Sequence, residues 1–324
     1  MNRKLIAVDC GKAETKVYGY DMRTGQIRNE VIRSRAEHAD DLVKLSLREG
    51  SHIVTFAKPD KDMEGEWTIG ALGGQTSYSN SKMDHIHKIM TLLAIALVTD
   101  NGDSVSVSIG CPMSVFSNDI EKKQYADYIL PNGRVDLVVD GQEHYFYIEK
   151  DRCMVFPESF GALFLFEDKF EGKAGVIDIG GLNVNASFFL DKTLDPYNSK
   201  TEKLGYYALI SLLRNRLNAY CDASFDDNMV EHFLKQGYVD KMKETAKIIE
   251  EVMEQHVARI ERVLKDWDRA STTLIFIGGT SKLLQKQIMN QFGKTAVIPE
   301  DANLINSRGF LRAMIIGNGY KSPI

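Results

Sequence analysis

Two aspartates occupy equivalent places in the chain, each after an apolar run and one residue before a glycine. Asp9 precedes Gly11 and Asp178 precedes Gly180. Carboxylates at strand ends can hold hydrated Mg²⁺, which takes one or two carboxylates together with the phosphate oxygens of a substrate. Alternatively, each aspartate caps only its own turn, as Asx side chains often do. Because both aspartates occupy the same position in a repeated pattern, we favour a metal-linked role for both.

Glycine-containing turns follow three apolar runs, at Gly11, at Gly180-Gly181 and at Gly278-Gly279. Glycine lets backbone N–H groups approach a phosphate closely. A tight turn also needs glycine for steric reasons alone, so it is the coincidence of three turns that indicates a polyphosphate site. The motif G-x-x-x-x-G-K-[ST] is absent, which excludes a P-loop, and no G-x-G-x-x-G follows a strand, which disfavours a dinucleotide fold.

Two lysines and a glutamate carry further charge near these turns. Lys16 follows Asp9 by seven residues and would reach a phosphate from the next strand. Lys12 lies in the turn itself, where an exposed, solvated lysine is the favoured alternative. Glu158 follows Pro157 and has two interpretations, stabilisation of a helix start or activation of a water that attacks a γ-phosphate. From the residues alone the first is favoured.

The elements that must position these residues alternate between strands and helices. We expect strands at 5–8, 17–20, 26–32, 53–57, 66–69, 104–109, 134–139, 144–149, 175–179, 184–190, 273–277 and 296–298, helices at 87–98, 118–130, 158–166, 206–220, 239–268, 282–292 and 305–316, and a glycine- and serine-rich loop at 71–81. The pattern of strand, Asp-x-Gly turn and strand occurs twice, about half a chain length apart. This spacing indicates a domain-scale duplication.

The length of the chain indicates how many domains it forms, and its charge argues against some classes of binding partner. The 324 residues correspond to slightly more than two domains, and 40 basic against 45 acidic residues leave no global positive field for DNA or anionic lipid. The four cysteines are far apart, as expected of free thiols in a reducing cytoplasm. No apolar run approaches the ~20 residues of a membrane-spanning helix. We therefore expect a cytoplasmic protein that binds neither membrane nor nucleic acid directly.

A pair of histidines, His85 and His87, suggests a metal site at first sight. On a helix, residues two apart do not face one another, so a joint site is not expected. No Ser/His/Asp or Cys/His arrangement stands out in the sequence.

Five motifs, in this order, resemble those of the actin/sugar-kinase/chaperone ATPase superfamily. They are Ile6-Ala-Val-Asp-Cys-Gly11 with Lys16, Met154-Val-Phe-Pro-Glu-Ser159, Val176-Ile-Asp-Ile-Gly-Gly-Leu-Asn183, Leu274-Ile-Phe-Ile-Gly-Gly-Thr280 and Asn306-Ser-Arg-Gly-Phe310. They look like the first phosphate loop, first connecting segment, second phosphate loop, adenosine loop and second connecting segment of that superfamily. Within it, the stretch at 107–112 and the hairpin at Gly141 are most similar to ParM-type plasmid-segregation actins.

The resemblance implies an α/β fold of duplicated ribonuclease-H-like domains with a nucleotide cleft between them. Domain I would comprise 1–165 and 306–324, with a small peripheral subdomain at about 33–82, and domain II would comprise 166–305. Asp9 and Asp178 would organise Mg²⁺ through water, and Glu158 would handle the attacking water, so that these three residues are the catalytic set. The implied nucleotide-binding residues are Gly11, Lys12, Lys16, Gly180, Gly181, Asn183, Gly278, Gly279 and Thr280.

The sequence departs from the superfamily pattern at two positions of the phosphate loops. Lys12 stands where many members have a small or hydroxyl residue, and Leu182 replaces a common threonine. These two side chains therefore depart from the phosphate contacts of the superfamily, and Lys12 would add a positive charge of its own.

The function implied by the resemblance is a phosphohydrolase of ATP or GTP that self-associates into filaments with bound nucleotide. It would move plasmid or phage DNA through a DNA-binding adaptor protein. The alternative is a small-molecule kinase or activator ATPase of the same superfamily that does not polymerise. A membrane-tethered scaffold would need a terminal amphipathic helix, which neither 1–5 nor 317–324 offers.

Overall fold

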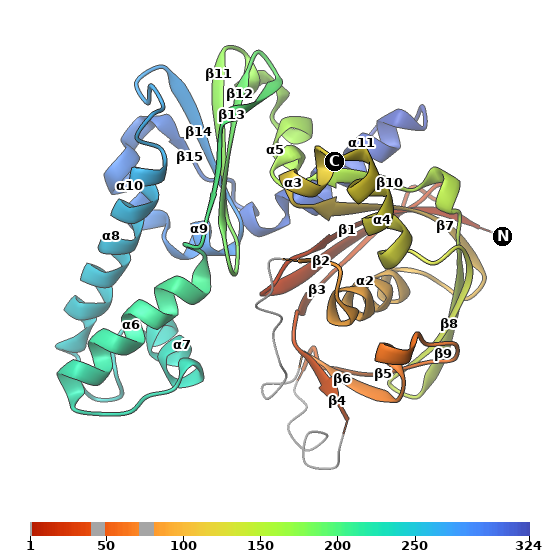
Figure 1. Cartoon of the computed structure of the whole chain (residues 1–324), viewed down its shortest axis with the longest axis horizontal. Coiled ribbons are helices and arrows are strands. Elements are labelled where there is room, and N and C mark those ends of the chain that lie inside the picture. The colour runs from red at the N-terminus through yellow and green to blue at the C-terminus, as the bar shows by residue number, and fades with distance from the viewer. Residues whose placement is uncertain (1, 40–48, 71–80) are drawn as a thin grey trace. The chain divides into compact units, whose positions relative to one another are not determined.

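The computed structural model describes residues 2–39, 49–70 and 81–324 (Figure 1). The loop predicted at 71–81 lies outside these residues except for Ser81. The chain divides into two compact units, unit 1 with Met1–Leu165 and Leu304–Ile324, and unit 2 with Phe166–Asn303. Each unit contains one β-sheet.

The sheet of unit 1 has the strand order β3-β2-β1-β7-β9-β8-β5-β6-β4, and β10 pairs with β7. The strands are β1 (Arg3–Cys10), β2 (Glu14–Asp21), β3 (Ile27–Arg33), β4 (Ala36–His38), β5 (His52–Phe56), β6 (Glu66–Ile69), β7 (Asp103–Cys111), β8 (Gly133–Val139), β9 (Gln142–Ile148) and β10 (Met154–Pro157). The helices are α2 (His85–Val98), α3 (Met113–Phe116), α4 (Asp119–Ile129), α5 (Phe160–Leu165) and α11 (Ile305–Gly317).

Helices cover both faces of strand β1. Successive side chains of a strand point to opposite faces, so the residues of β1 pack alternately against one helix and the other. Ile6 and Val8 pack into the core around the apolar helix α2. Leu5 and Ala7 face the other way and pack with Phe310 and its neighbours on α11. Strand β1 is consequently buried along nearly its whole length.

Three parallel strands of this sheet end at the same edge. Strands β1 and β10 each run parallel to β7. Strand β1 ends just after Asp9, β7 ends at Cys111 and β10 ends at Pro157. The carboxyl ends of parallel strands are where α/β sheets carry their ligands. Residues from distant parts of the chain therefore meet at this edge.

Unit 2 repeats the central part of this arrangement. Its strand order is β13-β12-β11-β14-β15, with β11 antiparallel to β12 and parallel to β14. Asp178 pairs with Asn185 across the first hairpin, as Asp9 pairs with Lys16 in unit 1. The elements are β11 (Lys173–Ile179), β12 (Val184–Leu190), β13 (Thr193–Glu202), β14 (Thr272–Ile277), β15 (Ala296–Val297), α6 (Tyr206–Cys221), α7 (Asp227–Gln236), α8 (Thr245–Val263), α9 (Gly279–Leu283) and α10 (Gln285–Phe292).

Several elements of unit 2 differ from the sequence expectation. Strand β13 and helix α7 were not predicted, and the long helix expected at 239–268 is the shorter α8. The Asp226 side chain caps the start of α7, and Gly237, at φ +86°, ends it. A short bridge between Val239 and Met242 then separates α7 from α8. Local caps and turns thus break a run whose apolar spacing predicted one continuous helix.

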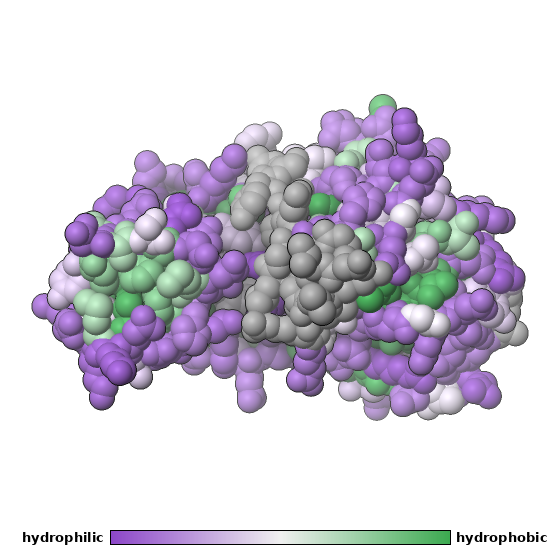
Figure 2. Space-filling view, turned by 90° about the horizontal axis from the view of Figure 1, so that it is seen from below, coloured by the Kyte–Doolittle hydropathy of each residue, from purple (hydrophilic) through white to green (hydrophobic). Residues whose placement is uncertain are grey.

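Apolar side chains also reach the surface of unit 2. Figure 2 shows them gathered, among hydrophilic residues, at the end of the unit where α6 and α7 lie. The exposed large side chains of these two helices include Tyr220 and Met229. The patch forms only because two helices lie side by side, which explains why it has no motif in the sequence.

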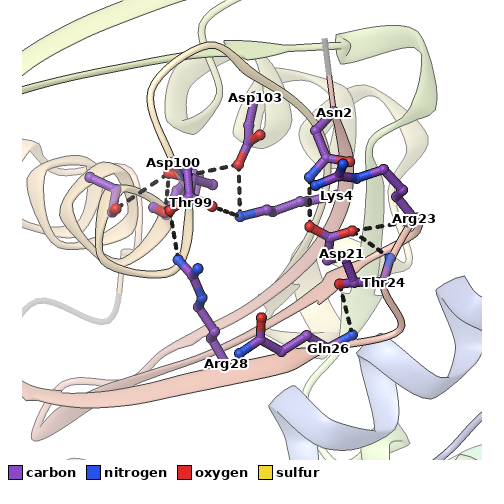
Figure 3. Close-up of polar contacts among 12 residues, drawn as sticks. Asn2, Lys4, Asp21, Arg23, Thr24, Gln26, Arg28, Thr99, Asp100 and Asp103 are labelled. Atoms are coloured by element: carbon purple, nitrogen blue, oxygen red, sulfur yellow. Dashed lines mark hydrogen bonds and ion pairs between the residues drawn. The ribbon is translucent and has the colours of Figure 1, made fainter.

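A buried lysine joins the start of β1 to the loop before β7 (Figure 3). Lys4 is only 2% exposed, and its Nζ lies 2.7 Å from Asp100 Oδ2 and 2.8 Å from Asp103 Oδ2. Asp103 is also buried and accepts a hydrogen bond from the Asp100 N–H. On the exposed side, Arg28 pairs with Asp100 at 2.9 Å.

Lys4→Met should lower the free energy of unfolding by about 3 kcal/mol, because the buried Asp103 carboxylate loses its counter-ion. Arg28→Met removes an exposed ion pair with Asp100 and should cost less than about 1 kcal/mol. Urea denaturation of both variants at pH 7 tests the difference. Equal losses in the two variants would show that the buried pair contributes no more than the exposed one.

Candidate functional site

The first turn of the chain holds a buried carboxylate at the end of β1. The Gly11 N–H donates to the Glu14 carbonyl at 3.0 Å and closes the turn. A Cβ atom on Gly11 would lie 2.8 Å from that same carbonyl oxygen, so the turn requires glycine. Asp9 is 8% exposed, and burial raises its pKa against the opposing charges of Lys16 and Lys82.

Lys16 lies on β2 directly opposite Asp9 and is buried to the same degree. Its Nζ donates to the Glu14 carbonyl at 3.2 Å. The Lys12 side chain instead binds residues at the start of α2. Its Nζ lies 2.9 Å from the Ser81 carbonyl and 3.1 Å from Asp84 Oδ2. The Lys12 side chain is largely buried, so the expectation of an exposed, solvated lysine at this position is wrong.

Glu158 is paired with a lysine that lies outside every recognised sequence motif. The Nζ of Lys82 lies 2.5 Å from Glu158 Oε1 and donates to the Cys10 carbonyl at 2.7 Å. Burial lowers the pKa of Lys82, but the nearby charges of Glu158, Tyr125 and Asp9 outweigh it, so the pKa lies above its ordinary value. Lys82 therefore stays a cation between the first turn and Glu158.

The helix predicted at 158–166 begins two residues later than expected. Pro157 ends strand β10, and α5 starts at Phe160. Between them Ser159 has φ +76°, which is outside the helical region. The interpretation of Glu158 as a residue of the first helical turn is therefore wrong. Its backbone instead extends the sheet edge, donating from its N–H to the Cys111 carbonyl at 2.9 Å.

An asparagine of helix α11 connects Asp9 to this turn. Asn306 Oδ1 accepts from the Ser159 N–H at 3.2 Å, and the Asn306 side chain also hydrogen-bonds the Asp9 carboxylate. Asn306 lies in a recognised motif, but neither contact has a local signature, because the partners come from residues far away in the chain. Lys82 has no motif around it at all.

Two glycines allow α5 and α11 to touch backbone to backbone. A Cβ atom on Gly161 would lie 2.4 Å from Asn306 Cα, and one on Gly309 would lie 2.1 Å from the Gly161 carbonyl oxygen. Any larger residue at either position would push the helices apart. The close crossing brings Asn306 up to Asp9 and Ser159.

The second Asp-x-Gly turn, in unit 2, is held by the start of helix α6. The Tyr206 and Tyr207 N–H groups donate to the carbonyls of Gly180 and Gly181 at 2.9 and 3.0 Å. The Gly180 N–H donates to the Asn183 carbonyl at 3.0 Å, as the Gly11 N–H does to Glu14 in unit 1. The two turns of the repeat therefore share one backbone geometry.

The third glycine turn lies against the second. Gly278 has φ +88°, and a Cβ atom there would lie 2.7 Å from Asp178 Oδ1. Thr280 Oγ1 donates to the Gly180 carbonyl at 3.4 Å. Gly279 is the first residue of α9. Unit 2 thus brings the buried Asp178 carboxylate together with both of its predicted glycine turns.

Comparisons with known proteins agree with this geometry. Residues 7–161 match the family model of the N-terminal domain of actin-like proteins. A 15-stranded ParM filament from Clostridium botulinum is similar with a TM-score of 0.75 at 16% identity, over 97% of this chain and 99% of that one. The chain has the actin-like fold.

Two further structures are similar to this chain. An Alp12 filament structure has a TM-score of 0.65 at 24% identity, with 98% of this chain and 100% of that one covered. An archaeal actin homologue in complex with ADP has a TM-score of 0.71 at 19% identity, covering 95% and 98% of the two chains. No curated protein sequence matches the chain.

The donor set of this protein fits Mg²⁺ better than a transition metal. Within residues 2–39, 49–70 and 81–324 no three His, Cys, Asp or Glu side chains cluster as a metal site. Each unit instead has one buried carboxylate at a strand end, Asp9 or Asp178. Mg²⁺ needs only one or two carboxylates, since substrate phosphates and water supply its other ligands.

The histidine pair forms no joint site in the described part of the chain. His87 is buried with its Nε2 3.2 Å from the Tyr125 hydroxyl, and burial holds its pKa well below the ordinary value. His85 packs near Trp67 instead. Among the described helices, none is both long and apolar enough to cross a membrane.

We expect a buried histidine to make the protein less stable in acid. His256 Nε2 hydrogen-bonds the Leu204 carbonyl at 3.0 Å, while its buried Nδ1 has no partner among the described residues. Burial lowers the pKa of His256 to about 4, so the unfolded chain binds a proton first as the pH falls. The contribution of His256 to the free energy of unfolding is therefore complete above about pH 6.5 and is lost progressively as the pH falls toward 4.

We expect His256 to account for about 2 kcal/mol of the loss in unfolding free energy between pH 7 and pH 5. His256→Gln keeps a donor for the Leu204 carbonyl but does not titrate, so its unfolding free energy should fall by that much less. Urea denaturation of both proteins at the two pH values measures the difference. An identical pH dependence would contradict the assignment.

Proposed function

We propose that this protein hydrolyses ATP or GTP in a Mg²⁺-dependent reaction and assembles into filaments when the nucleotide is bound. The observation that carries the proposal is the cluster of the buried Asp9, Lys16 and Lys82 with the partly buried Glu158 at one sheet edge. Two carboxylates at the carboxyl ends of parallel strands, with two cations beside them, suit a phosphoanhydride and an attacking water. Family likeness to actin-like proteins supports the same function.

In the proposed reaction, water attacks the γ-phosphorus and the bond from phosphorus to the β-phosphate oxygen breaks, giving nucleoside diphosphate and phosphate. Glu158 orients the water and accepts its proton, and Lys82 holds Glu158 in place. Lys16 and the backbone N–H groups of the glycine turns bind phosphate oxygens. Mg²⁺, held through water by Asp9 and Asp178, would neutralise charge on the phosphates.

Further nucleotide contacts remain as predicted from the resemblance. Gly278 and Gly279 would flank the nucleoside, and Asn183 and Thr280 would complete the nucleotide-binding set. The interdomain cleft, the domain boundaries and the peripheral subdomain at about 33–82 also stay predictions.

Self-association and partners follow from the same proposal. Two similar structures are filaments by description, an Alp12 filament and a ParM filament. We propose that this protein works in the cytoplasm and segregates plasmid or phage DNA through a DNA-binding adaptor. The net charge of -5 argues against direct DNA binding.

Light scattering and pelleting across a range of protein concentrations, with Mg-ATP, Mg-GTP or Mg-ADP, test this function. A filament-forming nucleotidase shows a critical concentration with nucleoside triphosphate and releases phosphate without any added acceptor. A small-molecule kinase or activator ATPase would show no critical concentration, and its nucleotide consumption would depend on an acceptor. The absence of assembly with every nucleotide would overturn the filament proposal.

A further inference from the structure

Helix α11 reaches the Asp9 carboxylate and the backbone next to Glu158 through one buried side chain. Asn306 is 5% exposed, donates to the Asp9 carboxylate and accepts from the Ser159 N–H at 3.2 Å. Ser159 directly follows Glu158 in the chain. One amide group therefore holds both Asp9 and the backbone that carries Glu158.

The backbone at Ser159 needs such an anchor. Its φ of +76° is disfavoured for a residue with a side chain, and its buried hydroxyl has no hydrogen-bond partner among the described residues. Backbone held in a disfavoured region persists only where the surrounding structure fixes it, and such places concentrate at functional sites. No local side-chain hydrogen bond of Ser159 among the described residues compensates for this conformation. The conformation does, however, fix the direction of the backbone that carries Glu158.

The crossing of α5 and α11 explains why the anchor is rigid. Gly161 and Gly309 place the two helix backbones in direct contact, so Asn306 cannot move away from Ser159 without separating the helices. The side chain is too short to reach both partners from a greater distance. The spacing between Asp9 and Glu158 is thus set by helix packing.

We propose that Asn306 is a positioning residue that fixes Asp9 and Glu158 relative to one another by bridging the Asp9 carboxylate and the Ser159 N–H. The inference rests on the proposed nucleotide hydrolysis, which it deepens by naming a residue that acts through both carboxylates. A displacement of about 1 Å in such a group can cost on the order of 10²-fold in rate. Substrate binding depends less on this spacing than the chemical step does.

Two variants of Asn306 separate its two contacts. Asn306→Ala removes both, whereas Asn306→Asp keeps an acceptor for the Ser159 N–H but replaces the donor to Asp9 with a second carboxylate. In nucleotide-free, metal-free protein, hydrogen–deuterium exchange at the Ser159 amide should increase in Asn306→Ala and stay close to wild type in Asn306→Asp. Ser307→Ala is the matched control, because Ser307 is the next buried residue of α11 and its hydroxyl bonds, among the described residues, only the local Leu304 carbonyl.

In steady-state hydrolysis with Mg²⁺, both Asn306 variants should lower kcat by 10-fold to 100-fold and change KM less than threefold. The Ser307→Ala control should retain wild-type values for both. Values of kcat within threefold of wild type in both Asn306 variants would overturn the inference alone. Absence of hydrolysis by the wild-type protein would instead overturn the proposed function. If Asn306→Ala does not fold, the near-isosteric Asn306→Asp decides the kinetic result.

Discussion

Glu158→Gln should lower kcat for nucleotide hydrolysis by at least about 100-fold and leave nucleotide binding and filament assembly close to wild type. The amide keeps the size of the side chain and a hydrogen bond to Lys82, but it cannot accept the proton of the attacking water. Glu158→Ala would be a poorer test, because it removes the hydrogen-bond acceptor of the buried Lys82 cation at 2.5 Å as well as the charge.

Phosphate release under single-turnover conditions measures the chemical step in Glu158→Gln, and pelleting with Mg-ATP or Mg-GTP measures assembly. Glu149→Gln is a suitable control, because Glu149 forms ion pairs with Arg3 and Arg152 in the same unit and away from Asp9. Hydrolysis by Glu158→Gln at the wild-type rate would limit Glu158 to a structural pairing with Lys82.

Gly309→Ala should destabilise unit 1 by at least about 3 kcal/mol and abolish hydrolysis. The added Cβ would lie 2.1 Å from the Gly161 carbonyl oxygen and 2.4 Å from Gly161 Cα, and neither backbone atom can rotate away. Overpacking of cores typically costs 1–3 kcal/mol, and a collision with backbone belongs at the upper end or beyond. The displaced α11 would also carry Asn306 away from Asp9.

Gly317→Ala, in the last turn of the same helix, provides the comparison for Gly309→Ala. A Cβ at Gly317 meets no atom within 4 Å, so this substitution should be neutral or stabilising by up to about 1 kcal/mol. Urea denaturation and thermal unfolding compare the two variants. Similar stability in both would show that α5 and α11 can separate without penalty.

The repeated strand and turn pattern could be predicted from sequence because its causes are local. Asp9, Gly11 and the apolar residues before them define a strand and a tight turn within a dozen residues, and the same holds for Asp178 and Gly180. The structure places both turns as expected and confirms the actin-like fold. The second hairpin of unit 2 was missed because Thr193–Glu202 is polar and lies at the sheet edge.

A helix predicted from apolar spacing alone was too long. Residues 239–268 have a helical stripe, yet only Thr245–Val263 is one helix, because a turn after Gly237 and a break after Val263 end it. Residue 158 was predicted to lie in a helix for another local reason, because Pro157 suits a first helical turn. Pro157 instead ends a parallel strand, whose pairing with β7 depends on residues about 45 positions earlier.

The sequence by itself determined the strand-end aspartates, the glycine turns and the order of motifs, because each depends on neighbouring residues. Only the tertiary structure decided that Lys82 pairs with Glu158, that Lys12 is bound at the start of α2, and that Asn306 bridges Asp9 and Ser159. These contacts join residues far apart in the chain through buried charges and helix packing. Their partners become neighbours only when parallel strands and the Gly161–Gly309 crossing bring them together.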